Sequence, residues 1–218
     1  MKFSVLLRKD LRREWRSKHV LQAGAVLVAL FFVVGLFAFQ NLQDSPRAAA
    51  FLLWTPILFS TAAMVGRAFG NEHDLGTLAW LQSLPFPTAW IGWSRTLVDG
   101  FVALFLVGLS ALLARAVFEI PLSLPLLALL GLATIGLAVM GSLSAAIATQ
   151  AAARELLLPL LLIPVAAPLL MAGVKGTMQV LVQPTWESGQ SSLLLLLAYD
   201  AIAIGLAAIL WQPLLEDA

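Results

Sequence analysis

The N-terminal stretch MKFSVLLRKDLRREWRSKHVLQAGAVLVALFFVVGLFAF, residues 1–39, decides the fold class. Seven of its first eighteen residues are Lys or Arg, opposed only by Asp10 and Glu14, and the following run Val20–Phe39 carries no charge. Twenty apolar residues are enough to cross a hydrocarbon layer as one helix. A dense Lys/Arg cluster beside such a helix holds that end in the cytoplasm. We therefore expect a membrane helix that begins on the cytoplasmic side.

The composition extends this expectation to the whole chain. Hydrophobic residues make up 61% of it and charged residues 11%, whereas soluble domains carry about 25% charged residues. There is no cysteine, which excludes disulfides, thiolate metal sites and a cysteine nucleophile. No nucleic-acid-binding motif follows the basic head, so anionic lipid is its expected partner and nucleic acid is not.

Six apolar stretches follow one another along the chain and predict an all-α membrane protein with one transmembrane domain, residues 1–218. An even number of spans places both termini on the same side, which the basic head makes the cytoplasm. Outside the head the basic residues divide evenly between the two sides, so the orientation rests on the N-terminus. The predicted spans are roughly 20–39, 48–66, 96–114, 124–149, 156–174 and 191–211.

The head itself has a helical pattern. Phe3, Leu7, Leu11 and Trp15 recur at every fourth position, which predicts one apolar stripe on a helix over residues 1–19. A helix with an apolar stripe and basic flanks lies in the membrane interface. The alternative is a basic tail that sets the topology and does nothing further.

The segment 67–95 is the longest polar interruption, and the topology places it in the cytoplasm. Asp74 suits the N-cap of a short helix that Pro85 and Pro87 end, and Thr88 suits the N-cap of the next one. Such a helix can serve as a docking element for a soluble partner. It can equally be a connector on the membrane surface.

Two motifs resemble the haem exporter protein B (CcmB) family, the membrane permease subunit of the bacterial cytochrome c maturation ABC transporter. The first is NEHDLGTLAWLQSLPFP, residues 71–87, and the second is RELLLPLLLIPVAAPLL, residues 154–170. The likeness covers essentially the whole chain. It implies an ABC-2-type exporter fold in the bacterial cytoplasmic (inner) membrane.

The resemblance also implies a division of labour in a complex. The chain has no Gly-x-x-x-x-Gly-Lys-Ser/Thr loop, so ATP has to bind to a cytoplasmic ABC ATPase subunit. Further implied partners are a haem-handling membrane subunit, a small membrane subunit and the periplasmic haem chaperone; pairing with a second copy or with the haem-handling subunit stays open. The residues expected to contact the ATPase are Glu72, Asp74, Gly76, Thr77, Leu78 and Leu81.

No cofactor is expected to bind this chain directly. Haem ligation uses His, Met, Cys or Tyr, and the two histidines, His19 and His73, both fall on the cytoplasmic side of the predicted topology. Whether haem touches this subunit stays open. Met140, Met171 and Met178 are expected to be packing residues.

Polar residues and prolines inside the spans are the other candidates. Asp200 lies in the middle of the sixth span, where an acid costs about 2.5–3.5 kcal/mol; it is either a functional group or a protonated acid bonded to a neighbouring helix. Pro164 and Pro168 bend the fifth span, as a hinge or as a static kink. The i, i+4 spacing of Arg95 and Asp99 predicts a local ion pair.

Three other functions compete with this prediction. An ABC-2-type permease that exports a drug, a lipid or a polysaccharide would share the same architecture. A passive scaffold would not bind an ATPase. An intramembrane enzyme needs several reactive groups at one depth, and Asp200 has only Tyr199 beside it, so we expect no catalytic site.

Overall fold

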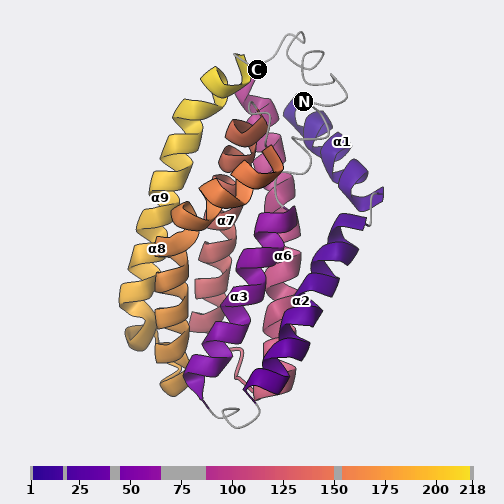
Figure 1. Ribbon diagram of the computed structural model, residues 1–218. Helices are drawn as coiled ribbons and strands as arrows, with labels where there is room; N and C mark the ends of the chain where they lie inside the picture. Colours follow the sequence, from indigo (N-terminus) through magenta and orange to yellow (C-terminus); the bar gives the residue numbers. More distant parts are fainter. Residues whose placement is uncertain (1, 17–18, 40–44, 65–86, 150–153, 217–218) are drawn as a thin grey trace.

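Figure 1 shows a computed structural model of the protein, which describes residues 2–16, 19–39, 45–64, 87–149 and 154–216. In this part of the chain every element is a helix, which confirms the predicted all-α class. The helices are α1 (Lys2–Arg16), α2 (His19–Ala38), α3 (Pro46–Met64), α6 (Ala89–Phe118), α7 (Leu124–Thr149), α8 (Arg154–Val182) and α9 (Trp186–Glu216).

Six of these helices, all except α1, are long and apolar enough to cross a membrane. Each of the six predicted spans coincides largely with one of them. They stand side by side as a bundle, and the two ends of the chain lie at the same end of it (Figure 1). The six-span architecture predicted from the apolar stretches is therefore confirmed.

The predicted boundaries are wrong at several helix ends. Helix α6 begins at Ala89 rather than 96, α8 continues to Val182 rather than 174, and α9 begins at Trp186 rather than 191. The 30 residues of α6 extend for about 45 Å at 1.5 Å per residue, which exceeds the roughly 30 Å hydrocarbon core. Hydrophobicity marks the edge of that core, but the helices continue beyond it.

One consequence concerns the polar segment 67–95. Its last residues, including Arg95, belong to α6 and not to a connecting loop. Thr88 occupies the N-cap position of α6 as predicted, but its side chain makes no capping hydrogen bond. The part of the segment up to residue 86 lies outside the described residues.

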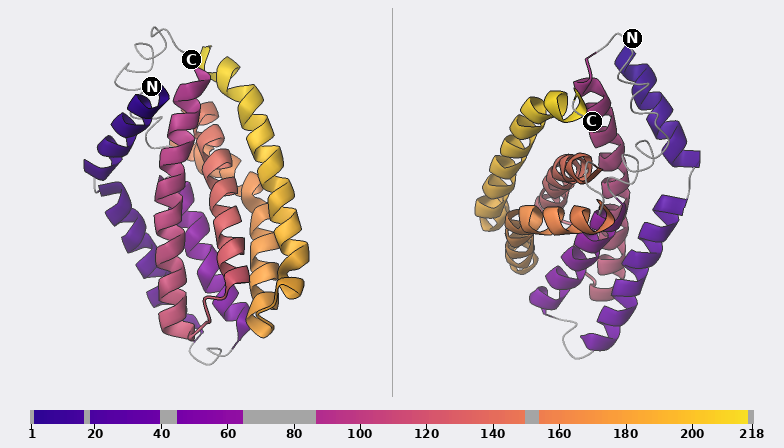
Figure 2. Two further views of the ribbon diagram at one scale, coloured as in Figure 1. Left: turned by 180° about the vertical axis from the view of Figure 1, so that it is seen from behind. Right: turned by 45° about the horizontal axis from the view of Figure 1, so that its top comes forward.

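Helices α3 and α7 form the interior of the bundle. Helix α7 packs against α6, α8 and α9, and α3 packs against α2, α6 and α8. Two-thirds of the membrane-spanning residues of α3 and α7 are buried, but only 22% of those of α2 and α9. Helices α2 and α9 therefore present their apolar side chains at the outside of the bundle, on opposite flanks (Figure 2).

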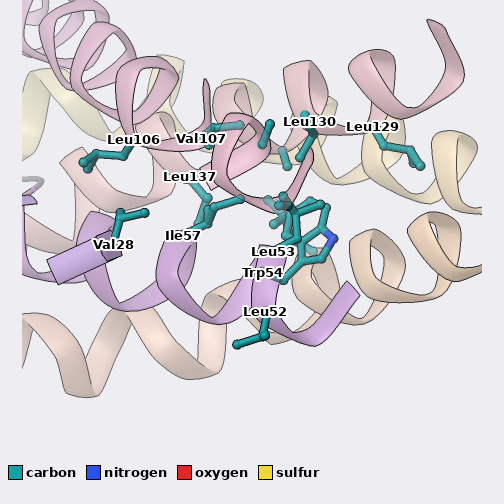
Figure 3. Close-up of a cluster of buried hydrophobic side chains, with 14 of the residues drawn as sticks. Val28, Leu52, Leu53, Trp54, Ile57, Leu106, Val107, Leu129, Leu130 and Leu137 are labelled. Atoms are coloured by element: carbon teal, nitrogen blue, oxygen red, sulfur yellow. The ribbon is translucent and has the colours of Figure 1, made fainter. Parts of the chain in front are cut away.

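Trp54 of α3 lies in the main hydrophobic cluster, among Leu53, Ile57 and Leu129 (Figure 3). Its indole Nε1 donates a hydrogen bond of 2.9 Å to Thr177 Oγ1 of α8. The ring covers Gly173, where an added Cβ atom would come within 2.5 Å of it. Small residues let membrane helices approach closely, and Gly173 provides that approach between α3 and α8.

Replacing Gly173 with alanine is expected to destabilise the bundle by about 1–3 kcal/mol, because the Trp54 ring has to move out of a packed core. Gly205→Ala is the matched control, since nothing lies within 4 Å of the Cβ it would add. Thermal unfolding of both variants in detergent micelles measures the difference. Equal melting temperatures would contradict the packing role of Gly173.

Candidate functional site: a buried ion pair beneath the N-terminal helix

Helix α1 packs along α6 at the end of the bundle where both termini lie (Figures 1 and 2). Leu6 is buried in a cluster that includes Ile91 of α6 and Trp211 of α9. The rings of Phe3 and Trp90 meet edge to face with their centroids 6.1 Å apart. The basic N-terminal helix is therefore held against the third span by its side chains.

A carboxylate and a guanidinium are buried together at this contact. Asp10 of α1 is 2% exposed and Arg95 of α6 is 1% exposed. Arg95 Nη2 lies 3.3 Å from Asp10 Oδ1, and Ser94 Oγ donates a hydrogen bond of 2.6 Å to Asp10 Oδ2. The Lys9 side chain is 44% exposed, and its Nζ lies 3.1 Å from Asp10 Oδ1. Both oxygens of the Asp10 carboxylate thus face donors or cations.

This arrangement constrains α1 more than it stabilises it. Taking two charges out of water costs several kcal/mol for each ion, and their attraction roughly offsets that cost only when the geometry is good. Removing one partner leaves the other charge buried without compensation. The pair therefore favours the position of α1 along α6 at which Asp10 lies beside Arg95.

Glu14 lies one turn beyond Asp10 and is half-buried. Burial raises the pKa of its carboxyl group, and the positive charges of Arg95 and Arg13 lower it by less. A carboxyl group whose pKa is raised by folding favours the folded state in its protonated form. The contribution of Glu14 to the free energy of unfolding is therefore present at low pH and is lost as the pH rises through the raised pKa.

A second buried acid lies one turn further along α6. Asp99 is 5% exposed, and its Oδ2 accepts a hydrogen bond of 2.7 Å from Ser142 Oγ of α7. Buried polar side chains therefore connect α1 to α6 and α6 to α7 in succession. The local Arg95–Asp99 pair predicted from the sequence stays a prediction, because the ion pair that the structure places at Arg95 is the one with Asp10.

Asp200 of α9 is buried against α7. It is 5% exposed, and neither carboxylate oxygen has a hydrogen-bond partner in the part of the chain that the structure describes. Its Oδ1 packs on Gly136, where an added Cβ atom would come within 2.6 Å of it. The expected hydrogen bond from Asp200 to a Ser or Thr of a neighbouring helix is thus not formed by these residues.

The prolines of α8 lie within one continuous helix, Arg154–Val182. Pro164 and Pro168 are both exposed, and the first turns of α8 run at a steep angle to the rest of it (Figure 2). Next to them, Tyr199 Oη of α9 donates a hydrogen bond of 2.9 Å to the carbonyl of Val165. The predicted bend is present, and a neighbouring helix holds it.

The structure tests only part of the predicted site. The six predicted ATPase contacts, Glu72, Asp74, Gly76, Thr77, Leu78 and Leu81, lie outside the described residues. In the predicted stripe, Phe3 and Leu7 are half-buried and Leu11 is 36% exposed; the Trp15 side chain is not described. The side chains that are buried against the bundle are instead Leu6 and Asp10.

Sequence reasoning missed Asp10, Ser94 and Ser142 as parts of one network. Asp10 is four residues after Leu6 and therefore shares its helix face, and an acid on the apolar side of a basic helix is the signal that it has a buried partner. Ser94 gives no such signal, because it is 84 positions away in the chain. No group of three or more acidic or histidine side chains able to hold a metal occurs within the described ranges.

The fold defines a multi-pass α-helical membrane protein with an amphipathic helix fixed to its bundle by a buried ion pair. A family model described as "CcmB protein" matches residues 1–212. The chain is also 27% identical over 213 residues to "Heme exporter protein B" of Bradyrhizobium diazoefficiens, with 93% of this chain and 92% of that protein covered. The chain belongs to the CcmB family.

Arg95→Gln is expected to destabilise the protein by about 3–5 kcal/mol, because it removes the buried cation beside the Asp10 carboxylate and leaves the partly exposed Lys9 as its cationic neighbour. The double variant Asp10→Asn with Arg95→Gln should recover much of that loss, since no buried charge remains. Arg12→Gln, on the exposed side of the same helix, is the control. Denaturation in detergent with a double-mutant cycle measures the coupling, and additive effects of the two substitutions would contradict it.

Glu14→Gln is expected to raise the melting temperature at pH 8, because it removes a carboxylate that burial disfavours. As the pH falls below the raised pKa of Glu14, the wild-type side chain becomes neutral too, and the difference should vanish near the ordinary pKa of 4.5. Melting curves over this pH range provide the test. A variant that is less stable than wild type at pH 8 would show that attraction to Arg95 and Arg13 outweighs burial.

Proposed function

We propose that this protein couples ATP hydrolysis by a partner subunit to haem export or to the release of the haem-loaded periplasmic chaperone. Membership of the CcmB family makes the chain the membrane permease subunit of the haem export system in cytochrome c maturation. The observation that carries the proposal is the match of the family model over residues 1–212. The six membrane-spanning helices support it independently.

The orientation that we propose places both termini in the cytoplasm of a bacterial cell, with the bundle in the inner membrane. The two ends of the chain lie at the same end of the bundle (Figure 1), and that end carries the seven basic residues of the head. Positive charge beside the first span is retained on the cytoplasmic side. The segment between α3 and α6 then lies on the side where ATP is available.

Coupling would pass through the α1–α6 contact. The segment 65–86 precedes α6 directly in the chain, and Ser94 and Arg95 are in the first turns of that helix. Because these two residues hold Asp10, a displacement of α6 by a bound ATPase would carry α1 with it. Asp99 and Ser142 would pass the same displacement to α7. Two buried contacts about one turn apart on α6, Asp10 with Arg95 and Asp99 with Ser142, support this route.

The proposed partners follow from what the chain lacks. It has no phosphate-binding loop, so the ATP site would be on a cytoplasmic ABC ATPase subunit. Haem chemistry would belong to a haem-handling membrane subunit, assisted by a small membrane subunit and the periplasmic chaperone. The chain itself would bind no cofactor directly. Its own partner in the membrane would be the haem-handling subunit or a second copy.

The competing function is an ABC-2-type permease for a drug, a lipid or a polysaccharide. The family match favours cytochrome c maturation over it. Deleting the gene separates the two functions, because only the maturation role predicts that haem staining of c-type cytochromes disappears.

The double variant Glu72→Lys with Gly76→Trp is expected to abolish co-purification of the ATPase and to remove most of the holocytochrome c. The two substitutions place a positive charge and a bulky ring at the proposed contact. Glu187→Lys is the control, since Glu187 is an exposed acid at the opposite end of the bundle. The measurements are affinity purification from solubilised membranes and haem staining, at equal levels of the membrane protein. Normal ATPase recovery and normal holocytochrome in the double variant would exclude residues 71–87 as the coupling segment.

A further inference from the structure

An open pocket with a cavity volume of about 810 Å³ lies at the end of the bundle opposite α1. The start of α3, the last two turns of α8 and the first turn of α9 form its walls. Its polar lining includes Arg47 of α3 and Lys175, Gln179 and Gln183 of α8. Helix α3 and the consecutive helices α8 and α9 thus place polar residues around one space.

Among the described residues that line this pocket, the charged side chains are both cationic. Arg47 and Lys175 are both exposed, and neither has a hydrogen-bond or ion-pair partner in the described part of the chain. No carboxylate is among the described residues that line the pocket. The N-terminus of α3 adds its unpaired N–H groups and a positive partial charge. The pocket therefore suits an anion.

The pocket lies at the level of the lipid headgroups. Helix α8 ends at Val182 and α9 begins at Trp186, so this is where the apolar spans finish. Trp186 is 51% exposed, and exposed Trp at the end of a span is typical of the membrane–water interface. A phospholipid places its phosphate at this depth.

An apolar path leads from the pocket toward the middle of the membrane. Met171, Met178 and Val182 lie on one face of α8, because they are seven and four residues apart. Met178 and Val182 line the pocket, and Met171, further along the same face, is 73% exposed. Lys175 lies on this face as well. Lys175 lies between Met171 and Met178, so a headgroup held at Lys175 leaves Met171, one turn deeper in the membrane, as the apolar surface beside the start of an acyl chain.

We propose that this pocket binds the phosphate of an anionic phospholipid, held by Arg47 and Lys175, with an acyl chain that continues past Met171 on the exposed face of α8. The phosphate charge compensates the two cations, which the described residues leave without a counter-charge. Bound lipid fills the space between α3, α8 and α9 and holds their ends together. The proposal does not depend on the transport function, because it concerns the opposite end of the bundle.

The test uses the full-length protein in detergent and native mass spectrometry with dioleoylphosphatidylglycerol as the probe. Each Lys or Arg near anionic lipid contributes about 1 kcal/mol, so Arg47→Gln and Lys175→Gln should each weaken binding about fivefold, and the double variant about 25-fold. Arg115 is a basic residue in the last turn of α6, near the same end of the bundle, and it does not line the pocket. Arg115→Gln should therefore change lipid binding little. Because Arg47 and Lys175 are exposed, the melting temperature of the lipid-free double variant should equal that of the wild type.

Three results would overturn the proposal. The first is equal binding of dioleoylphosphatidylcholine, which shares the acyl chains but has no net charge. The second is an equal loss on Arg115→Gln, which would show general surface attraction. The third is complete displacement of the lipid by inorganic phosphate, together with phosphate binding in lipid-free detergent that is as tight as the binding of dioleoylphosphatidylglycerol. That result would assign the site to a soluble anion.

Discussion

A carboxylate and a guanidinium can be buried together only if each provides the counter-charge of the other, and this constraint places the N-terminal helix on the bundle. Asp10 and Arg95 are among the most buried charged residues that the structure describes, and Ser94 donates a hydrogen bond to Oδ2 of the acid. An amphipathic helix held only by lipid would be able to slide and rotate in the membrane interface. The ion pair removes that freedom, so α1 and the start of α6 behave as one unit.

Two further acids, Asp99 and Asp200, are buried inside the bundle, and their surroundings differ. Asp99 is satisfied by the Ser142 hydroxyl of α7, so two central helices share a polar contact. Asp200 packs its carboxyl group against Gly136 of α7. Helix α7 meets both acids with small or hydroxylated side chains, and it packs against α6, α8 and α9. Displacements of α6 and α9 therefore meet at α7.

The two ends of the bundle differ in how their cations are compensated. At the end with the termini, Arg95 is paired within the protein. At the other end, Arg47 and Lys175 face an open pocket. Under the two proposals above, one end of the bundle would respond to an ATPase and the other would stay fixed in the membrane. A network inside the protein can provide the first, and lipid phosphate can provide the second.

The sequence by itself determined the all-α class, the six spans, the interfacial N-terminal helix and the family, because length, hydrophobicity and the two motifs are properties of short contiguous segments. It placed helix ends too early or too late, since hydrophobicity reports the hydrocarbon edge and α6, α8 and α9 extend past it. The pairing of Asp10 with Ser94 and Arg95, the contact of Asp99 with Ser142 and the pocket around Arg47 and Lys175 were decided only by tertiary structure. Each joins residues from different helices, and which helix faces meet depends on packing across the whole bundle.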